Sequence, residues 1–128
     1  MARGDGLARL KRKLERFPQI LKDEVRPALE QSANQMADIV RRNLPNGPDD
    51  RGHIRDSVQV TDGRHELSVK VSMGDANQPY AAPLEFGHAN GSKHTPATPV
   101  FFPARKITTK RHRARVSRAF RRGVKKLT

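Results

Sequence analysis

The apolar residues among the first 44 positions recur at intervals of three and four, the spacing of one face of an α-helix. Pro18 and Pro27 interrupt this pattern, and each removes a backbone hydrogen-bond donor. We therefore predict a flexible segment or short helix over residues 1–17 and a main helix over residues 18–44, with a kink at Pro27. The apolar positions are Leu7, Leu10, Leu14, Phe17, Leu21, Val25, Leu29, Ala33, Met36 or Ala37, Val40 and Leu44.

Two short runs that alternate between apolar and polar residues follow, the second over residues 66–72. Because successive side chains of a strand point to opposite faces, Leu67, Val69 and Val71 are expected to share one face. Residues 62–65, between the two runs, begin with Asp-Gly, which is a hairpin signal. The pattern predicts a half-buried antiparallel hairpin.

The chain between this hairpin and Pro103 is rich in proline and glycine, which is typical of turns and irregular structure. Residues 88–95 within it are predicted to form an exposed loop, and residues 104–127 a final helix with a narrow apolar stripe. The fold class expected is α+β: a long N-terminal helix, an antiparallel β-hairpin or small sheet, an irregular Pro/Gly-rich segment and a basic C-terminal helix. We expect a single domain over residues 1–128, with a β-rich core over residues 54–103.

Composition limits the size of the core. Hydrophobic residues make up 34% of the chain and aromatic residues 5%. Such a chain gains little from burial within one copy, so contact with other copies is expected; the alternative is a small domain with disordered basic ends. Cysteine is absent, which excludes disulfides and thiolate metal sites. No apolar run reaches the roughly 20 residues that span a bilayer, and the N-terminus lacks the apolar stretch of a signal peptide, so we expect synthesis in the cytoplasm and no membrane contact.

Positive charge is concentrated at the C-terminal end. The net charge is +13, and residues 86–128 contain twelve Lys or Arg and no Asp or Glu. Such a segment attracts polyanions such as DNA, docks on acidic protein surfaces, or serves only as a solvated helix face, and the sequence leaves these three interpretations open. Any DNA contact would be with phosphates and without sequence preference. The residues concerned are Arg105, Lys106, Lys110, Arg111, Arg113, Arg115, Arg118, Arg121, Arg122, Lys125 and Lys126.

Catalytic chemistry is not indicated. The five histidines lack the paired spacing of zinc ligands, and the carboxylates are scattered, so we predict no catalytic residues, no metal, no cofactor and no small-molecule substrate. Glu85 differs from the other carboxylates because it lies in an apolar stretch. One interpretation is a catalytic carboxylate with a perturbed pKa. An anchor that holds a backbone amide or an arginine is the interpretation we favour.

The residues around Glu85 and before the final helix have structural roles that follow from their chemistry. Gly87 is expected to adopt positive φ in a tight turn, which glycine permits. Pro99 and Pro103 are expected to fix the start of the final helix. The apolar side chains are expected to fill the space between hairpin and helices. The assembly or core motif therefore consists of Tyr80, Leu84, Glu85, Phe86, Gly87, Pro99, Phe101 and Pro103.

Three short motifs, in this order, resemble those of a known family. Residues 51–58, Arg-Gly-His-Ile-Arg-Asp-Ser-Val, are similar to a Thr-Gly-x-Leu-Arg-x-Ser-Ile pattern that follows a long helix and a proline. Residues 80–88 resemble Tyr-Ala-x-x-Val-Glu-Phe-Gly-Thr, and residues 96–104 resemble Ala-x-Pro-Phe-Leu-x-Pro-Ala. Together they are similar to the tail-component family of long-tailed phages, which includes head–tail joining, neck and tail-completion proteins. Arg51 and His88 depart from the pattern, and the final helix is unusually basic.

The resemblance implies a structural protein of the virion, located in the neck or tail. It implies a homo-oligomeric ring, for which six copies is the natural expectation, between the portal complex and the tail. Neighbouring neck, portal-adaptor or tail-tube proteins would be the partners, and the basic helix would contact DNA in the channel or an acidic neighbour. The alternative function is a stand-alone protein that binds nucleic acid non-specifically through the basic C-terminal helix.

Overall fold

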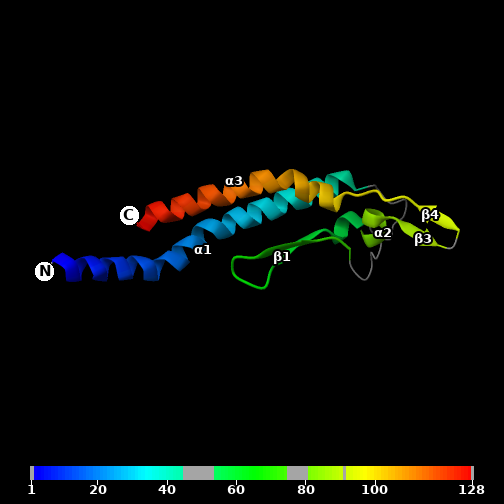
Figure 1. Ribbon diagram of the computed structural model, residues 1–128. Coiled ribbons are helices and arrows are strands. Elements are labelled where there is room, and N and C mark those ends of the chain that lie inside the picture. Colours follow the sequence, from blue (N-terminus) through cyan, green and yellow to red (C-terminus); the bar gives the residue numbers. More distant parts are fainter. Residues whose placement is uncertain (1, 45–53, 75–80, 91, 128) are drawn as a thin grey trace.

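The computed structural model describes residues 2–44, 54–74, 81–90 and 92–127, and it has the α+β class that the sequence predicts. A long N-terminal helix and a long C-terminal helix lie side by side, with one short hairpin along the side of this pair and a second at one of its ends (Figure 1). In chain order the elements are α1 (Ala2–Asn43), the 3-10 helix η1 (Ile54–Ser57), β1 (Gln59–Asp62), β2 (Val69–Ser72), α2 (Ala81–Phe86), β3 (His88–Asn90), β4 (Lys93–Thr95) and α3 (Phe101–Leu127).

The N-terminal helix is continuous. α1 passes through Pro18 without a break, so the predicted division into a short helix and a separate main helix is wrong. Proline removes one hydrogen bond, but tertiary packing holds the helix on both sides of it. The ring of Phe17 meets that of Phe120 edge to face, with centroids 6.1 Å apart, and Leu21 packs against a buried cluster. α1 also continues through Pro27, where a kink was predicted. Its ribbon changes direction in its blue N-terminal part (Figure 1).

Small residues form the contact between the two long helices. α3 lies antiparallel along α1, and the N-terminal turns of α1 extend beyond the C-terminal end of α3 (Figure 1). Ala28 and Ala37 of α1 are buried, as are Ala104, Ala119 and Gly123 of α3. Because these side chains are short, the two backbones approach closely, and Ala119 is fully buried between them.

A second cluster joins the helices to the first hairpin. Val40 and Leu44, at the end of α1, pack with Val58 and Val100. The guanidinium of Arg41 donates a hydrogen bond to the carbonyl oxygen of Val58 at 2.8 Å. The end of α1 is thereby fixed to the start of the sheet.

The first hairpin is present, but its loop is longer than predicted. β1 pairs antiparallel with β2, with Asp62 opposite Val69, so the loop comprises residues 63–68 rather than 62–65. Leu67 therefore lies in the loop and is exposed, contrary to the prediction, whereas Val69 and Val71 are partly buried. The reason is that the loop has its own bonds, including one from the Gly63 amide to the Ser68 carbonyl at 2.8 Å.

Arg26 of α1 anchors the same loop. Its guanidinium donates to the carbonyl oxygens of Glu66 and Ser68, at 2.8 and 3.2 Å, and also pairs with the carboxylate of Asp62. These bonds occupy loop carbonyls that a two-residue turn would not present. The hairpin loop is therefore shaped partly by a side chain 40 residues away in sequence from Glu66.

The predicted exposed loop over residues 88–95 is also corrected. β3 and β4 pair antiparallel across it, with His88 opposite Thr95 and Ala89 opposite His94. Turn residues between short runs are typical of a hairpin as well as of an irregular loop, so the residue types alone did not distinguish the two. The final helix likewise begins at Phe101 instead of residue 104, because Pro103 is tolerated inside a first helical turn.

Candidate functional site

The carboxylate of Glu85 caps the basic helix. Its Oε2 accepts hydrogen bonds from the backbone amides of Val100 and Phe101, at 2.8 and 2.9 Å, and its Oε1 accepts one from Phe102 at 2.9 Å. Only 6% of Glu85 is exposed. The next residue, Pro103, has no amide hydrogen, and the amide of Ala104 already bonds the carbonyl of Val100 at 3.2 Å. Every donor that the helix start leaves unpaired is therefore satisfied by one side chain.

This cap also supplies a charge that the helix lacks. α3 has no acidic residue in its first turn, where an anion is favourable to the helix dipole. Burial raises the pKa of Glu85, but the hydrogen bonds from Phe102, Val100 and Phe101 outweigh it, so the pKa lies below the ordinary value of 4.5. Glu85 is therefore ionised at neutral pH. Of the two interpretations drawn from the sequence, the backbone anchor describes these contacts.

Phe86 of the motif lies closer to the surface than predicted. Phe86 is 70% exposed and so does not fill the core, which corrects its predicted role. Its ring lies 5.7 Å from that of Phe102, which is 47% exposed. Phe101 is partly buried against the hairpin cluster. The capping carboxylate occupies the buried position of α2, which turns the neighbouring Phe86 outward.

The remaining motif residues divide between turn and helix start. Gly87 has φ of 83°, as predicted, in the left-handed region that glycine readily adopts. Pro99 precedes α3 and Pro103 lies in its first turn, both exposed. Leu84 lies in α2, and Tyr80 falls outside the described residues.

The basic residues of α3 separate into two groups. Arg115 donates to the hydroxyl of Ser32 at 2.8 Å and to the side-chain oxygen of Gln35 at 3.1 Å. Arg122 contacts Glu24 at 3.1 Å, and Lys126 pairs with the same carboxylate. These three cations hold α3 against α1 and are not available as a group for an external partner.

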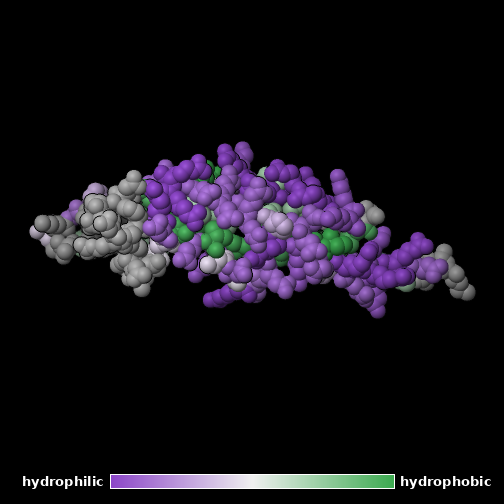
Figure 2. Space-filling view, turned by 180° about the vertical axis from the view of Figure 1, so that it is seen from behind, coloured by the Kyte–Doolittle hydropathy of each residue, from purple (hydrophilic) through white to green (hydrophobic). Residues whose placement is uncertain are grey.

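Most of the other cations point outward. They are exposed, and within the described part of the chain they form no hydrogen bond or ion pair through their side chains. The face seen in Figure 2 is accordingly mostly hydrophilic, with hydrophobic residues in separate small areas. The outward cations are Arg105, Lys106, Lys110, Arg111, Arg113, Arg118 and Arg121. Lys125 is also exposed.

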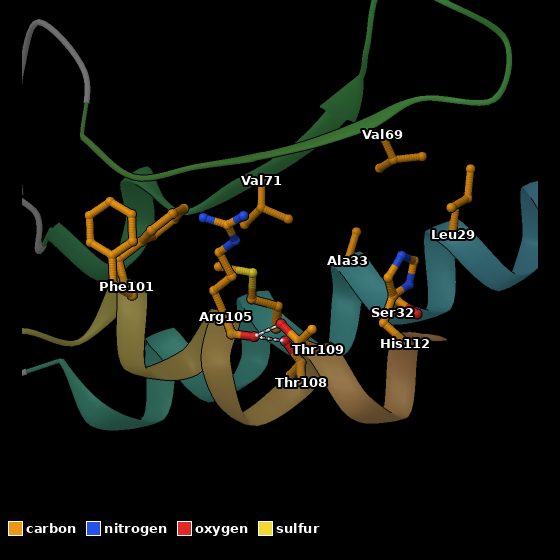
Figure 3. Close-up of a pocket in the computed structure, with 12 residues that line it drawn as sticks. Leu29, Ser32, Ala33, Val69, Val71, Phe101, Arg105, Thr108, Thr109 and His112 are labelled. Atoms are coloured by element: carbon orange, nitrogen blue, oxygen red, sulfur yellow. Dashed lines mark hydrogen bonds between the residues drawn. The ribbon is translucent and has the colours of Figure 1, made fainter. Parts of the chain in front are cut away.

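A cleft of about 540 Å³ lies between α1, β2 and α3. Leu29 and Ala33 of α1 face it, Val69 and Val71 lie across it on β2, and Arg105 lies at its α3 side (Figure 3). The lining is mainly apolar, and its members are Leu29, Ser32, Ala33, Met36, Val69, Val71, Phe101, Phe102, Arg105, Thr108, Thr109 and His112.

His112 is the only titratable residue besides Arg105 in this lining. Burial lowers its pKa below the ordinary value of 6.5, and the charge of Arg115 lowers it further. Its Nδ1 is buried and has no partner among the described residues. No three His, Asp or Glu side chains gather at a metal-binding distance in this or any other described region. Among the described residues, no helix has an apolar stretch suited to crossing a membrane.

Two features that the structure reveals were missed in the sequence. Glu24, which joins two cations of α3 to α1, gave no signal because its partners lie 98 or more residues away. The leucines at the start of α1 were assigned to a buried helix face. Leu7, Leu10 and Leu14 are instead 70%, 53% and 60% exposed, since α3 ends before it reaches them.

The comparisons with known proteins concern the part of the chain that ends at the cap. The family described as "Bacteriophage HK97-gp10, putative tail-component" matches residues 8–87, more than half of the chain. The matched segment contains α1 from residue 8 onward, the first hairpin and the Glu85–Gly87 motif, and α3 lies beyond it. No curated protein and no solved structure matches the chain. The chain belongs to the HK97 gp10-like family of phage tail components and is a phage tail-related structural protein of the virion.

Proposed function

We propose that the protein is one subunit of a ring at the head–tail junction of a tailed phage, where it connects the portal complex to the tail. It acts as a single domain in a neck or tail-completion ring, for which we expect six copies. Its partners are further copies and the neighbouring neck, portal-adaptor or tail-tube proteins. It performs no catalysis.

The observation that carries this proposal is the exposed aromatic pair beside the cap. Phe86 and Phe102 come from two different elements, and Glu85 fixes those elements to each other. Exposed aromatic side chains on a rigid base are typical of the central residues of protein interfaces. The family match supports a tail assembly as the place where this surface is used.

Genetic complementation tests the proposal. A phage that lacks the gene should produce full heads and separate tails, and the intact gene should restore joined particles. We expect Phe86→Ser with Phe102→Ser to reduce joined particles at least tenfold, with a circular dichroism spectrum like that of the unaltered protein. Phe86→Leu is the matched control, because it keeps an apolar side chain. Joined, infectious particles in the absence of the protein would refute the proposal.

A second candidate function is supported by the outward cations of α3. This function is non-specific binding of nucleic acid. Positive charges so close together favour the binding of a polyanion, and a DNA backbone supplies phosphates without requiring sequence recognition. Replacing Lys110, Arg118 and Arg121 with Gln should weaken DNA binding and flatten its dependence on salt. Sub-micromolar binding by a protein that stays monomeric would favour this candidate over the ring.

A further inference from the structure

The first turns of α1 form an arm with an uncovered apolar face. We call residues 5–16 the arm. Leu7, Leu10 and Leu14 line a shallow apolar surface, edged by Lys11 and Glu15. From Phe17 onward the same helix face is covered by α3, beginning with the ring of Phe120. The arm therefore continues a packing surface for which its own chain supplies no partner among the described residues.

The arm gains little stability from its own chain. It continues α1, but helical segments without tertiary packing are marginal in water, and Gly6 lowers the helix propensity of the arm further. Three leucines on one face are more apolar surface than a solvated helix normally presents. The arm is suited to an apolar cleft into which its leucines fit.

The cleft between α1, β2 and α3 has matching dimensions. Along α1 its apolar lining extends from Leu29 to Met36, seven residues or about 10.5 Å of helix. The leucine face of the arm extends from Leu7 to Leu14, also seven residues and about 10.5 Å. Val69 and Val71 close the opposite side of the cleft.

The charges at the two surfaces are also complementary. Arg105 lines the cleft, where its side chain extends from α3 toward Val71 (Figure 3), and Glu15 lines the leucine face. Both are exposed, and neither side chain has an ionic partner among the described residues. Pairing them would place Leu14 at the Phe101 end of the cleft and Leu7 at the Leu29 end.

The occupant cannot be the arm of the same chain. Leu14 and Leu29 belong to one continuous helix, about 22 Å apart along its axis, so the arm cannot fold back without breaking α1. A second copy of this chain has no such restriction.

We propose that the arm of one copy lies in the cleft of the next, with Leu7, Leu10 and Leu14 in the apolar lining and Glu15 paired with Arg105. The two surfaces differ, so each copy offers one of each, and such a head-to-tail contact forms a ring when the rotation from copy to copy closes. The inference rests on the proposed ring and names the surfaces that build it.

Cysteine cross-linking tests the contact directly, because the natural chain has no cysteine. Two single variants, Leu10→Cys and Thr109→Cys, are mixed before assembly and oxidised. We expect a disulfide-linked dimer in at least tenfold greater yield than from two matched mixtures. One pairs Arg12→Cys, on the opposite face of the arm, with Thr109→Cys; the other pairs Leu10→Cys with Ser117→Cys, on the exposed side of α3.

Charge exchange supplies an independent readout. Glu15→Arg should raise the concentration needed for half-assembly at least tenfold. Adding Arg105→Glu to the same chain should bring this concentration most of the way back to that of the unaltered protein. Both residues are exposed, so circular dichroism should be unchanged. A lack of rescue would refute the proposed pairing of Glu15 with Arg105.

The measurements distinguish an error in the proposed arm contact from an error in the proposed ring. If light scattering shows an oligomer but the three mixtures cross-link equally, the arm proposal is wrong and the ring stands. If the unaltered protein is monomeric and yet the first mixture cross-links selectively, the arm contact stands and the ring is wrong. A monomer without selective cross-linking refutes both.

Discussion

At the scale of single residues, the side chain of Glu85 alone accepts the hydrogen bonds of the first amides of α3. Three amides converge on one buried carboxylate, and the proline that follows them needs no acceptor. Charged hydrogen bonds are stronger than neutral ones, and the amides would be left without an acceptor if the carboxylate were removed. The position of the whole basic helix relative to α2 therefore depends on this residue.

We predict that Glu85→Gln lowers the free energy of unfolding by about 1–3 kcal/mol. The glutamine keeps one oxygen, but its amide group presents hydrogens to backbone donors. Urea unfolding followed by circular dichroism measures the change. Glu30→Gln is the control, because Glu30 is exposed and its ion pair in the described part of the chain is with Arg26 on the surface of α1. An equal effect of both substitutions would contradict the capping role.

The pH dependence of this contribution has a defined sign. The pKa of Glu85 is lower in the folded protein than the ordinary value of 4.5. The stabilisation is therefore fully present above the unfolded-state pKa and is lost as the pH falls through the folded-state pKa. The difference in unfolding free energy between the natural protein and Glu85→Gln should be constant from pH 7 to about pH 5.5 and should shrink below about pH 4.5. Since the other carboxylates are common to both proteins, their titration cancels; a difference that grows in acid would contradict this account.

At the scale of elements, the loop of the first hairpin depends on a close approach between Gly63 and Ser68. A Cβ atom on Gly63 would lie 2.7 Å from the Cβ of Ser68 and 2.1 Å from its hydroxyl oxygen. Only a residue without a side chain fits there while the Gly63 amide bonds the Ser68 carbonyl.

We therefore predict that Gly63→Ala lowers the free energy of unfolding by about 1–3 kcal/mol, the range for overpacked sites. Adding Ser68→Gly should recover part of the loss, whereas Ser68→Ala should recover little because it keeps the clashing Cβ. Thermal unfolding of the four proteins gives the comparison. The control is Gly6→Ala, where nothing lies within 4 Å and alanine favours the helix by about 0.5–1 kcal/mol.

The sequence predicted the elements better than their connections. Apolar residues recur every second position in a strand and every third or fourth position in a helix, because those positions face the core. This spacing correctly indicated the long helices and the β1–β2 pair. The shape of the hairpin loop depends on Arg26, which is distant in sequence, and the continuity of α1 at Pro18 depends on α3. No local pattern contains these contacts.

The functional residues divide in the same way. Glu85 was recognisable as an anchor because a carboxylate in an apolar segment must be satisfied by some donor. Its donors could not be identified, since they are backbone amides 15 to 17 positions away and carry no side-chain signal. The leucines of the arm were misplaced for a related reason: periodicity predicts an apolar face but not where the covering helix ends.

At the scale of the whole molecule, repulsion between the positive charges destabilises the fold. The net charge is +13, and cations follow one another at four-residue spacing in α3, as in Lys106 and Lys110, or Arg118 and Arg122. Like charges at this spacing repel by about 0.2–0.5 kcal/mol per pair at low salt. The ion pairs that hold α3, such as Arg122 with Glu24, act in the opposite direction, but their cations are exposed to solvent, which limits their contribution.

Repulsion should therefore dominate the response to salt. We predict that the melting temperature rises between roughly 20 and 300 mM NaCl, because screening at these concentrations reaches the distances between neighbouring cations. An equal ionic strength of a polyphosphate should raise it further, since a multivalent anion binds the folded helix surface. The variant with Gln at positions 110, 118 and 121 should melt higher at low salt and respond less to both additions. A melting temperature that falls with salt would mean that the ion pairs outweigh the repulsion between cations. The outward cations of α3 would then not form the unneutralised surface that an acidic partner would bind.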